Sequence, residues 1–139
     1  MNLFLEYKKK IYNLLKKLEK NGKLKVLIES KNITVELPPK NQNAEISCNA
    51  AMVLAKYNNS TPIKIAEFIK KELLKNFDEF KSIEIAGPGF INISFHLTFW
   101  KNFLSHVLEL DRKFGSNKIP KKKYNIEFVS ANPTGPLHV

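Results

Sequence analysis

The chain has 139 residues, 43% hydrophobic and 26% charged, so it is long enough for one globular domain and too apolar to be disordered. Lys and Arg outnumber Asp and Glu by 23 to 13, and the resulting net charge of +10 favours a polyanionic partner, either nucleic acid or an anionic membrane surface. The single cysteine excludes an internal disulfide, and no apolar run approaches the roughly 20 residues of a membrane span. With no signal-peptide core at its start, the sequence predicts a cytoplasmic protein.

The first part of the chain predicts a long helix and a β-hairpin. Apolar residues recur at helical spacing over 3–20, and Asn21-Gly22 supplies a stop signal. Residues 24–28 and 33–37 then alternate with period two, which predicts two paired strands. A polar loop over 38–46, opened by two prolines, is expected to follow the second strand.

Two helices are predicted next. The first is made of small residues and spans Cys48–Tyr57, where Cys48 is better explained as a buried filler than as a nucleophile. Thr61-Pro62 has the N-cap and first-turn chemistry that begins the second helix. The apolar face of the second helix is expected to hold Ile65, Ile69 and Leu73, widened by Ala66, Phe68 and Leu74.

The remaining elements complete an α+β domain. A strand at Ile83–Ile85 leads through the tight turn Ala86-Gly87-Pro88-Gly89 into an alternating strand, Phe90–Phe95. Phe90, Asn92 and Ser94 share one face of that strand. Thr98 is placed to cap a last helix, so the order is α-β-β-α-α-β-β-α, a sheet covered by helices.

The pattern changes after Arg112. Residues 113–123 combine turn formers, lysines and no periodicity, which indicates a linker between a domain at 1–112 and a new element. That element is one predicted strand, Tyr124–Val129, followed by a Pro/Gly-rich loop. A strand that enters a loop of small residues is how a nucleotide-binding α/β sheet opens, so 124–139 is expected to begin a larger catalytic fold.

Four polar side chains near the end of the chain have the chemistry of a ligand site. Glu127 is a carboxylate on an apolar strand, so it either faces solvent or pairs with a cation. Ser130 and Asn132 offer a hydroxyl and an amide to a small polar ligand, and His138 can donate to phosphate while neutral. Taken alone, these residues favour the plainer interpretation that Glu127 is a surface residue and His138 a disordered terminal one.

A resemblance to a known family changes that balance. The run Ile126-Glu127-Phe128-Val129-Ser130-Ala131-Asn132-Pro133-Thr134-Gly135-Pro136-Leu137-His138-Val139 resembles the segment that opens the catalytic domain of bacterial arginyl-tRNA synthetases. In that family His-Val begins the class I signature, which continues with glycine and a second histidine, and this chain stops before both. Upstream, 49–56, 65–67 and 86–92 are similar to the family's amino-terminal additional domain. Residues 45–49 depart from the Gly-Asp-Tyr-Ala-Thr/Ser-Asn type of sequence that many members have there.

The resemblance implies both a fold and an activity. Residues 1–112 would form an antiparallel sheet packed against helices, 113–123 a linker, and 124–139 the truncated start of a class I catalytic domain of Rossmann type. The parent protein would be an arginine–tRNA ligase, which activates L-arginine with ATP, accompanied by Mg²⁺, and transfers it to tRNA(Arg). The chain alone is expected to be inactive, to bind no cofactor tightly, and to derive from a monomeric parent.

The resemblance also implies roles for single residues. Glu127 would face the substrate guanidinium, while Ser130 and Asn132 would contact the main-chain end of arginine. His138, within the signature region 131–139, would contact the ATP phosphates. On the amino-terminal domain, Phe90 and Asn92 would engage an unstacked base of the tRNA D-loop, the ring by stacking and the amide by reading the base edge. From the sequence alone, the alternative is that Phe90 is core and Asn92 faces solvent.

A second hypothesis needs no catalysis. The positive charge and the Phe90/Asn92 face suffice for a stand-alone RNA-binding or tRNA-binding module, although such a module has no use for half of an ATP motif. A membrane-surface role is a distant third. Most lysine clusters are expected to be solvated helix faces (Lys8-Lys9-Lys10, Lys16-Lys17, Lys70-Lys71), whereas Lys121-Lys122-Lys123 is better placed to touch phosphates. His96 and His106 are expected to be structural, and no metal site is predicted.

Overall fold

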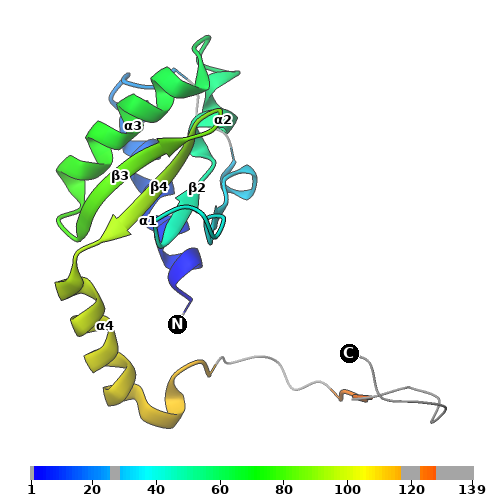
Figure 1. Ribbon diagram of the computed structural model, residues 1–139. Helices are drawn as coiled ribbons and strands as arrows, with labels where there is room; N and C mark the ends of the chain where they lie inside the picture. The colour runs from blue at the N-terminus through cyan, green and yellow to red at the C-terminus, as the bar shows by residue number, and fades with distance from the viewer. Residues whose placement is uncertain (1, 26–28, 117–122, 128–139) are drawn as a thin grey trace.

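A computed structural model of the chain describes residues 2–25, 29–116 and 123–127, and shows a helix-covered sheet with one helix extending from it (Figure 1). In chain order the elements are α1 (Leu3–Lys20), the 3-10 turn η1 (Ser30–Asn32), β1 (Val35–Glu36), β2 (Ile46–Cys48), α2 (Ala50–Ala55), α3 (Pro62–Asn76), β3 (Phe80–Ala86), β4 (Phe90–Phe95), α4 (Leu97–Leu110) and the 3-10 turn η2 (Asp111–Lys113). The strands are antiparallel in the order β1-β2-β4-β3. The predicted α+β class is therefore confirmed. No helix within the described residues has both the length and the apolar character to cross a bilayer.

Helices α1 and α3 begin where the sequence predicts. The side chain of Asn2 accepts a hydrogen bond from the Leu5 amide (3.1 Å), and that of Thr61 accepts one from Lys64 (3.4 Å), so each satisfies a free N–H of a first turn. Gly22, with φ of +71°, ends the turn after α1. The apolar faces of α1, α2 and α3 join one core with one face of the sheet, where Ile91, Ile93 and Phe95 of β4 are buried.

The predicted hairpin of 24–28 with 33–37 stays a prediction, because most of its first strand lies outside the described residues. Strand β1 is two residues long and pairs with β2, a partner that the sequence did not predict. The amide of Lys25 donates to the Asn58 side chain (2.7 Å), and residues 30–32 form η1, where the turn between the two predicted strands would lie. Leu24, Ile33 and Val35 are buried, so the alternation identified core positions. Residues 26–28 lie outside the described part.

Other boundaries also differ from the predictions. The polar loop before Ile46 ends in strand β2, whose three residues are all buried and so show no alternation. Helix α2 covers Ala50–Ala55 only, and α4 begins after His96 rather than under a Thr98 cap. Lys123–Glu127 form no strand, and the rest of the strand predicted at 124–129 lies outside the described residues.

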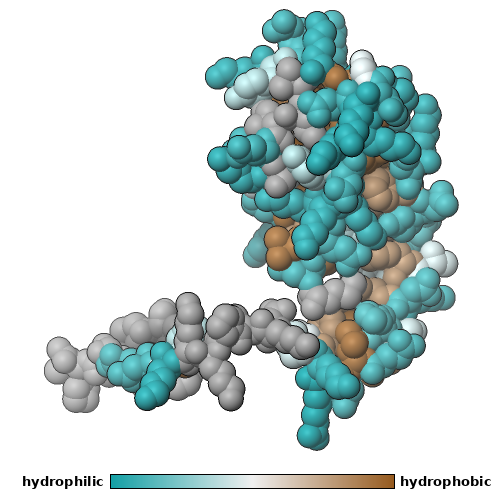
Figure 2. Space-filling model, turned by 180° about the vertical axis from the view of Figure 1, so that it is seen from behind, coloured by the Kyte–Doolittle hydropathy of each residue, from teal (hydrophilic) through white to brown (hydrophobic). Residues whose placement is uncertain are grey.

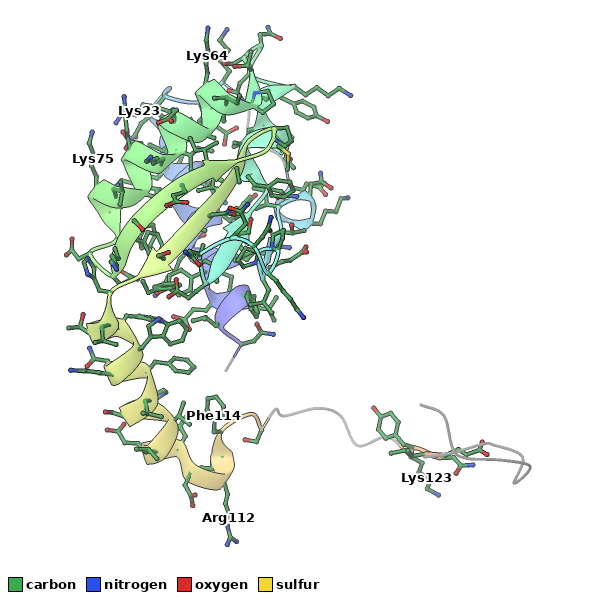
Figure 3. All side chains as sticks on the ribbon, viewed as in Figure 1. Lys23, Lys64, Lys75, Arg112, Phe114 and Lys123 are labelled. Carbon is green, nitrogen blue, oxygen red and sulfur yellow. The ribbon has the colours of Figure 1, made fainter. Side chains whose placement is uncertain are left out.

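On α3, Leu74, which was predicted to widen the apolar face, is exposed, whereas Glu72 is buried. The Glu72 carboxylate is compensated by Lys23 (Nζ to Oε1, 3.3 Å) and Lys75 (3.8 Å), which reach it from the same flank of the molecule (Figure 3). A carboxylate so placed is tolerated because its charge is paired.

Tyr7 joins α1 to the sheet. Its side chain is fully buried among Phe80, Phe95 and Phe99, and its hydroxyl donates to Glu79 Oε1 (3.0 Å). Lys10 lies near the same carboxylate (3.5 Å). Burial, and then the hydrogen bond to Glu79 and its negative charge, raise the pKa of the Tyr7 hydroxyl well above its ordinary value of 10.0.

This shift predicts a loss of stability in alkali. Above about pH 10 the unfolded tyrosine ionises while folded Tyr7 keeps its proton, so the stabilisation present below that pH is lost as the pH rises, by up to about 1.4 kcal/mol per pH unit. Urea titrations at a series of alkaline pH values should therefore show a steeper fall in unfolding free energy for the wild type than for Tyr7→Phe. Tyr57→Phe, at an exposed tyrosine, is the control and should keep the wild-type slope. Equal slopes for all three proteins would contradict the assignment.

Candidate RNA-binding site

The hairpin of β3 and β4 positions the candidate site. Ala86 pairs with Phe90 across the turn, in which Gly87 has φ of +52° and Gly89 has φ of +135°. A Cβ on Gly89 would lie 2.9 Å from Cβ of Pro62, so the turn sits directly against the first turn of α3. Both positions suit glycine because their φ values are unfavourable for residues with a side chain. At Gly89, Pro62 also leaves no room for a side chain. The turn thereby fixes where Phe90 enters the sheet.

A hollow of about 510 Å³ lies on the sheet face opposite the core. Its walls are the β3–β4 turn and the loop that follows β1. This loop is attached to β4, because Ser94 Oγ donates to the Asn43 carbonyl (3.0 Å) and Asn92 Nδ2 donates to Gln42 Oε1 (3.3 Å). The lining residues are Thr34, Glu36, Leu37, Pro38, Pro39, Gln42, Ser47, Ala86, Gly87, Pro88, Phe90 and Asn92.

Phe90 and Asn92 both line this hollow but differ in exposure. Phe90 is 39% exposed, whereas Asn92 is 3% exposed and lies opposite Ser47 of β2. The plain alternative for each residue is therefore wrong, because Phe90 is not core and Asn92 does not face solvent. Asn92 Oδ1 is buried without a hydrogen-bond partner among the described residues, which costs about 1–3 kcal/mol unless a ligand donates to it.

The lining suits a flat, neutral group better than a phosphate. Among the described residues that line it, Glu36 is the only charged one, and most of the others are apolar side chains or backbone. An exposed ring beside a buried acceptor offers stacking and one directional hydrogen bond, the combination that holds an unstacked base. Cys48 plays no part, because its side chain is fully buried and burial raises the pKa of its thiol to about 12. The filler interpretation of Cys48 is thus confirmed.

The predicted arginine and ATP residues are not brought together in the described part of the chain. Glu127 is exposed on a stretch without regular structure. Ser130, Asn132 and His138, with the whole signature region 131–139, lie outside the described residues, as do Lys121 and Lys122. On the helices, Lys9, Lys16, Lys17 and Lys71 are exposed, as predicted for solvated faces.

Sequence reasoning missed Gln42 and Ser47. Both are polar residues without a motif, one in a loop and one on a three-residue strand. The double proline at 38–39 marked the loop but gave no sign that it folds over β4. The pairing of β2 with β4 places Ser47 beside Asn92, and the hydrogen bond from the Asn92 amide places Gln42 there.

Comparisons with known proteins agree on one family. The model of the "Arginyl tRNA synthetase N terminal domain" matches residues 5–95. The whole chain is similar to proteins named "Arginine--tRNA ligase": it is 49% identical over 141 residues to that of Pelagibacter ubique, 43% over 142 to that of Bartonella henselae, and 40% over 140 to that of Wolbachia pipientis wMel. In each case it covers 24% of the relative, so the chain spans about a quarter of the length of these curated proteins.

The turn geometry predicts unequal effects of alanine at its two glycines. Gly87→Ala places a side chain in open space at a left-handed φ and should lower the unfolding free energy by about 1 kcal/mol. Gly89→Ala adds the overlap with Pro62 and should cost more than about 2 kcal/mol. Urea unfolding of the two variants is the measurement, with Gly87→Ala as the matched control. Equal losses would show that the contact with Pro62 does not constrain the turn.

Proposed function

Since this chain belongs to the family of the arginyl-tRNA synthetase amino-terminal domain, we propose that it is the leading part of an arginine–tRNA ligase and that its own task is to dock tRNA(Arg). The parent enzyme would activate L-arginine with ATP to an arginyl-adenylate, then transfer the arginine to the terminal ribose of the tRNA. The names of its relatives and their match along the full chain support this parentage.

The hollow beside Phe90 carries the docking proposal. The exposed Phe90 ring is free to stack on a base that has left its helix, and the buried Asn92 oxygen accepts an N–H from the edge of that base. Gln42 holds the Asn92 amide from the other side, so the oxygen rather than the nitrogen is left for the ligand. We assign this base to the D-loop of the tRNA, following the resemblance of the 86–92 segment.

The catalytic assignments remain proposals for the longer protein. Glu127 would bind the guanidinium of arginine, Ser130 and Asn132 its main-chain end, and His138 the ATP phosphates, with Mg²⁺ accompanying the nucleotide. A carboxylate facing a planar cation is a chemically sound pairing. The chain alone would not aminoacylate, because it supplies only the first segment of such a site.

Replacing Phe90 tests the docking. The 139-residue chain with Phe90→Ala should bind tRNA(Arg) about 1–3 kcal/mol more weakly than the wild type, the usual contribution of one stacked base. Tyr57→Ala is the matched control, because Tyr57 is also an exposed aromatic residue but does not line the hollow. Filter binding at fixed salt gives the affinities, and circular dichroism checks the fold. Unchanged affinity in a folded Phe90→Ala protein would remove this site.

A stand-alone RNA-binding module is the second candidate, favoured by a hollow and a net charge that need no catalytic domain. The two candidates differ in the native gene. For the ligase, the reading frame should continue past Val139 with glycine and a second histidine, and its full product should charge tRNA(Arg) with arginine in the presence of ATP. A frame that stops at Val139, or a longer product that binds tRNA without charging it, would favour the module.

A further inference from the structure

Helix α4 is amphipathic but buries none of its residues. Its apolar residues occupy about half of the helix circumference, at 100° per residue, and its polar residues occupy the other half. The helix leaves the end of the sheet and extends away from the body (Figure 1). A helix with such a face normally packs it against something, so the solvent-exposed arrangement indicates a missing partner.

One edge of the apolar face is partly covered by aromatic rings. Phe99 stacks on Phe95 of the core (4.3 Å between centroids), Phe103 lies next to Phe99 (6.2 Å), and Phe114 turns back onto Phe103 (6.3 Å). Figure 3 shows Phe114 on the inner side of the bend after α4, while Arg112 points away from it. These ring contacts form a continuous aromatic row that extends from the core along one side of the helix.

The other edge is bare. Leu97, Leu104 and Leu108 are 67%, 58% and 71% exposed, and they lie within about 40° of one another around the helix. We call these three residues the leucine stripe. Seen from behind, apolar surface is exposed at the lower end of the body, towards α4 (Figure 2). Contiguous apolar surface of this kind on a charged protein marks a contact with another surface.

We propose that the leucine stripe is the surface on which the part of the parent polypeptide beyond residue 139 docks, through a complementary aliphatic surface of its catalytic body. The inference rests on the proposed function, because it takes the parent to be about four times as long as this chain, as its relatives are. Helix α4 and η2 lie where the predicted 113–123 linker begins, and that linker would tether the following body within a short reach of the stripe.

Two other occupants fit less well. A second copy of the chain would bring two net charges of +10 together. A membrane surface is favoured by helices with many basic residues on the polar face, but α4 carries there one lysine, Lys101, together with His106 and Glu109. A covalently linked body needs neither charge compensation nor a basic face.

The test compares two double variants, each in the 139-residue chain and in the full gene product. Leu104→Glu with Leu108→Glu places two charges on the stripe, and Asn102→Glu with Ser105→Glu places the same charges on the opposite, exposed face. Trypsin cleavage at Arg112 and the lysines of 113–123 is the readout, because cleavage tracks how often the linked bodies separate. In the full product, the stripe variant should be cut at least about tenfold faster than the polar-face variant. In the 139-residue chain the two variants should be cut at similar rates.

Two outcomes overturn the proposal. One is equal cleavage of the two variants in the full product. The other is a 139-residue chain that sediments as a dimer and becomes a monomer only with the stripe variant, which would identify a second copy as the occupant. Aminoacylation by the wild-type full product is measured in parallel. If it fails to charge tRNA while the stripe variant still speeds cleavage, the proposed function falls and the docking surface stands.

Discussion

The fold depends on the two-residue alternation of strand β4. It has β2 on one side and β3 on the other, and its odd-numbered residues Ile91, Ile93 and Phe95 are buried in the core. Because a shift of one residue would exchange the two faces, the burial of these three side chains fixes the register of both neighbours. The same constraint sends Phe90 and Asn92 to the other side. One strand therefore holds the core together and orients the candidate site.

Prediction from sequence succeeded where a local signal agreed with the tertiary contacts. The long apolar period of α1, the Thr61-Pro62 start of α3 and the Gly-Pro-Gly turn all have local physical causes, and the structure has them in place. The failures lie where a distant partner decided the outcome. Strand β2 was not predicted, because it is too short and too buried to show a period. The burial of Glu72 beside Lys23 likewise rests on a contact that no helical pattern reveals.

In the candidate site too, some features were predictable from the sequence and others depend on distant contacts. That Phe90 and Asn92 share a face follows from period two, and their place after a glycine turn was visible in the sequence. That Asn92 is buried, with one end of its amide held by Gln42, depends on a loop about fifty positions earlier in the chain. The sequence therefore predicted which chemical groups lie at this site, but it did not predict how exposed each group is. Since exposure decides which group could stack on a ligand and which could accept a hydrogen bond from it, the proposed mode of recognition depends on the structure.

The unpaired oxygen of Asn92 has an evolutionary consequence. A valine or leucine there would remove a buried acceptor that nothing in the described chain satisfies, and would be expected to make the domain more stable. Proteins generally sit just above the stability they need, so such replacements are readily available to them. A laboratory selection for heat resistance alone would then drift towards an apolar residue at this position. An asparagine retained there across a lineage would be a record of selection acting on recognition rather than on folding.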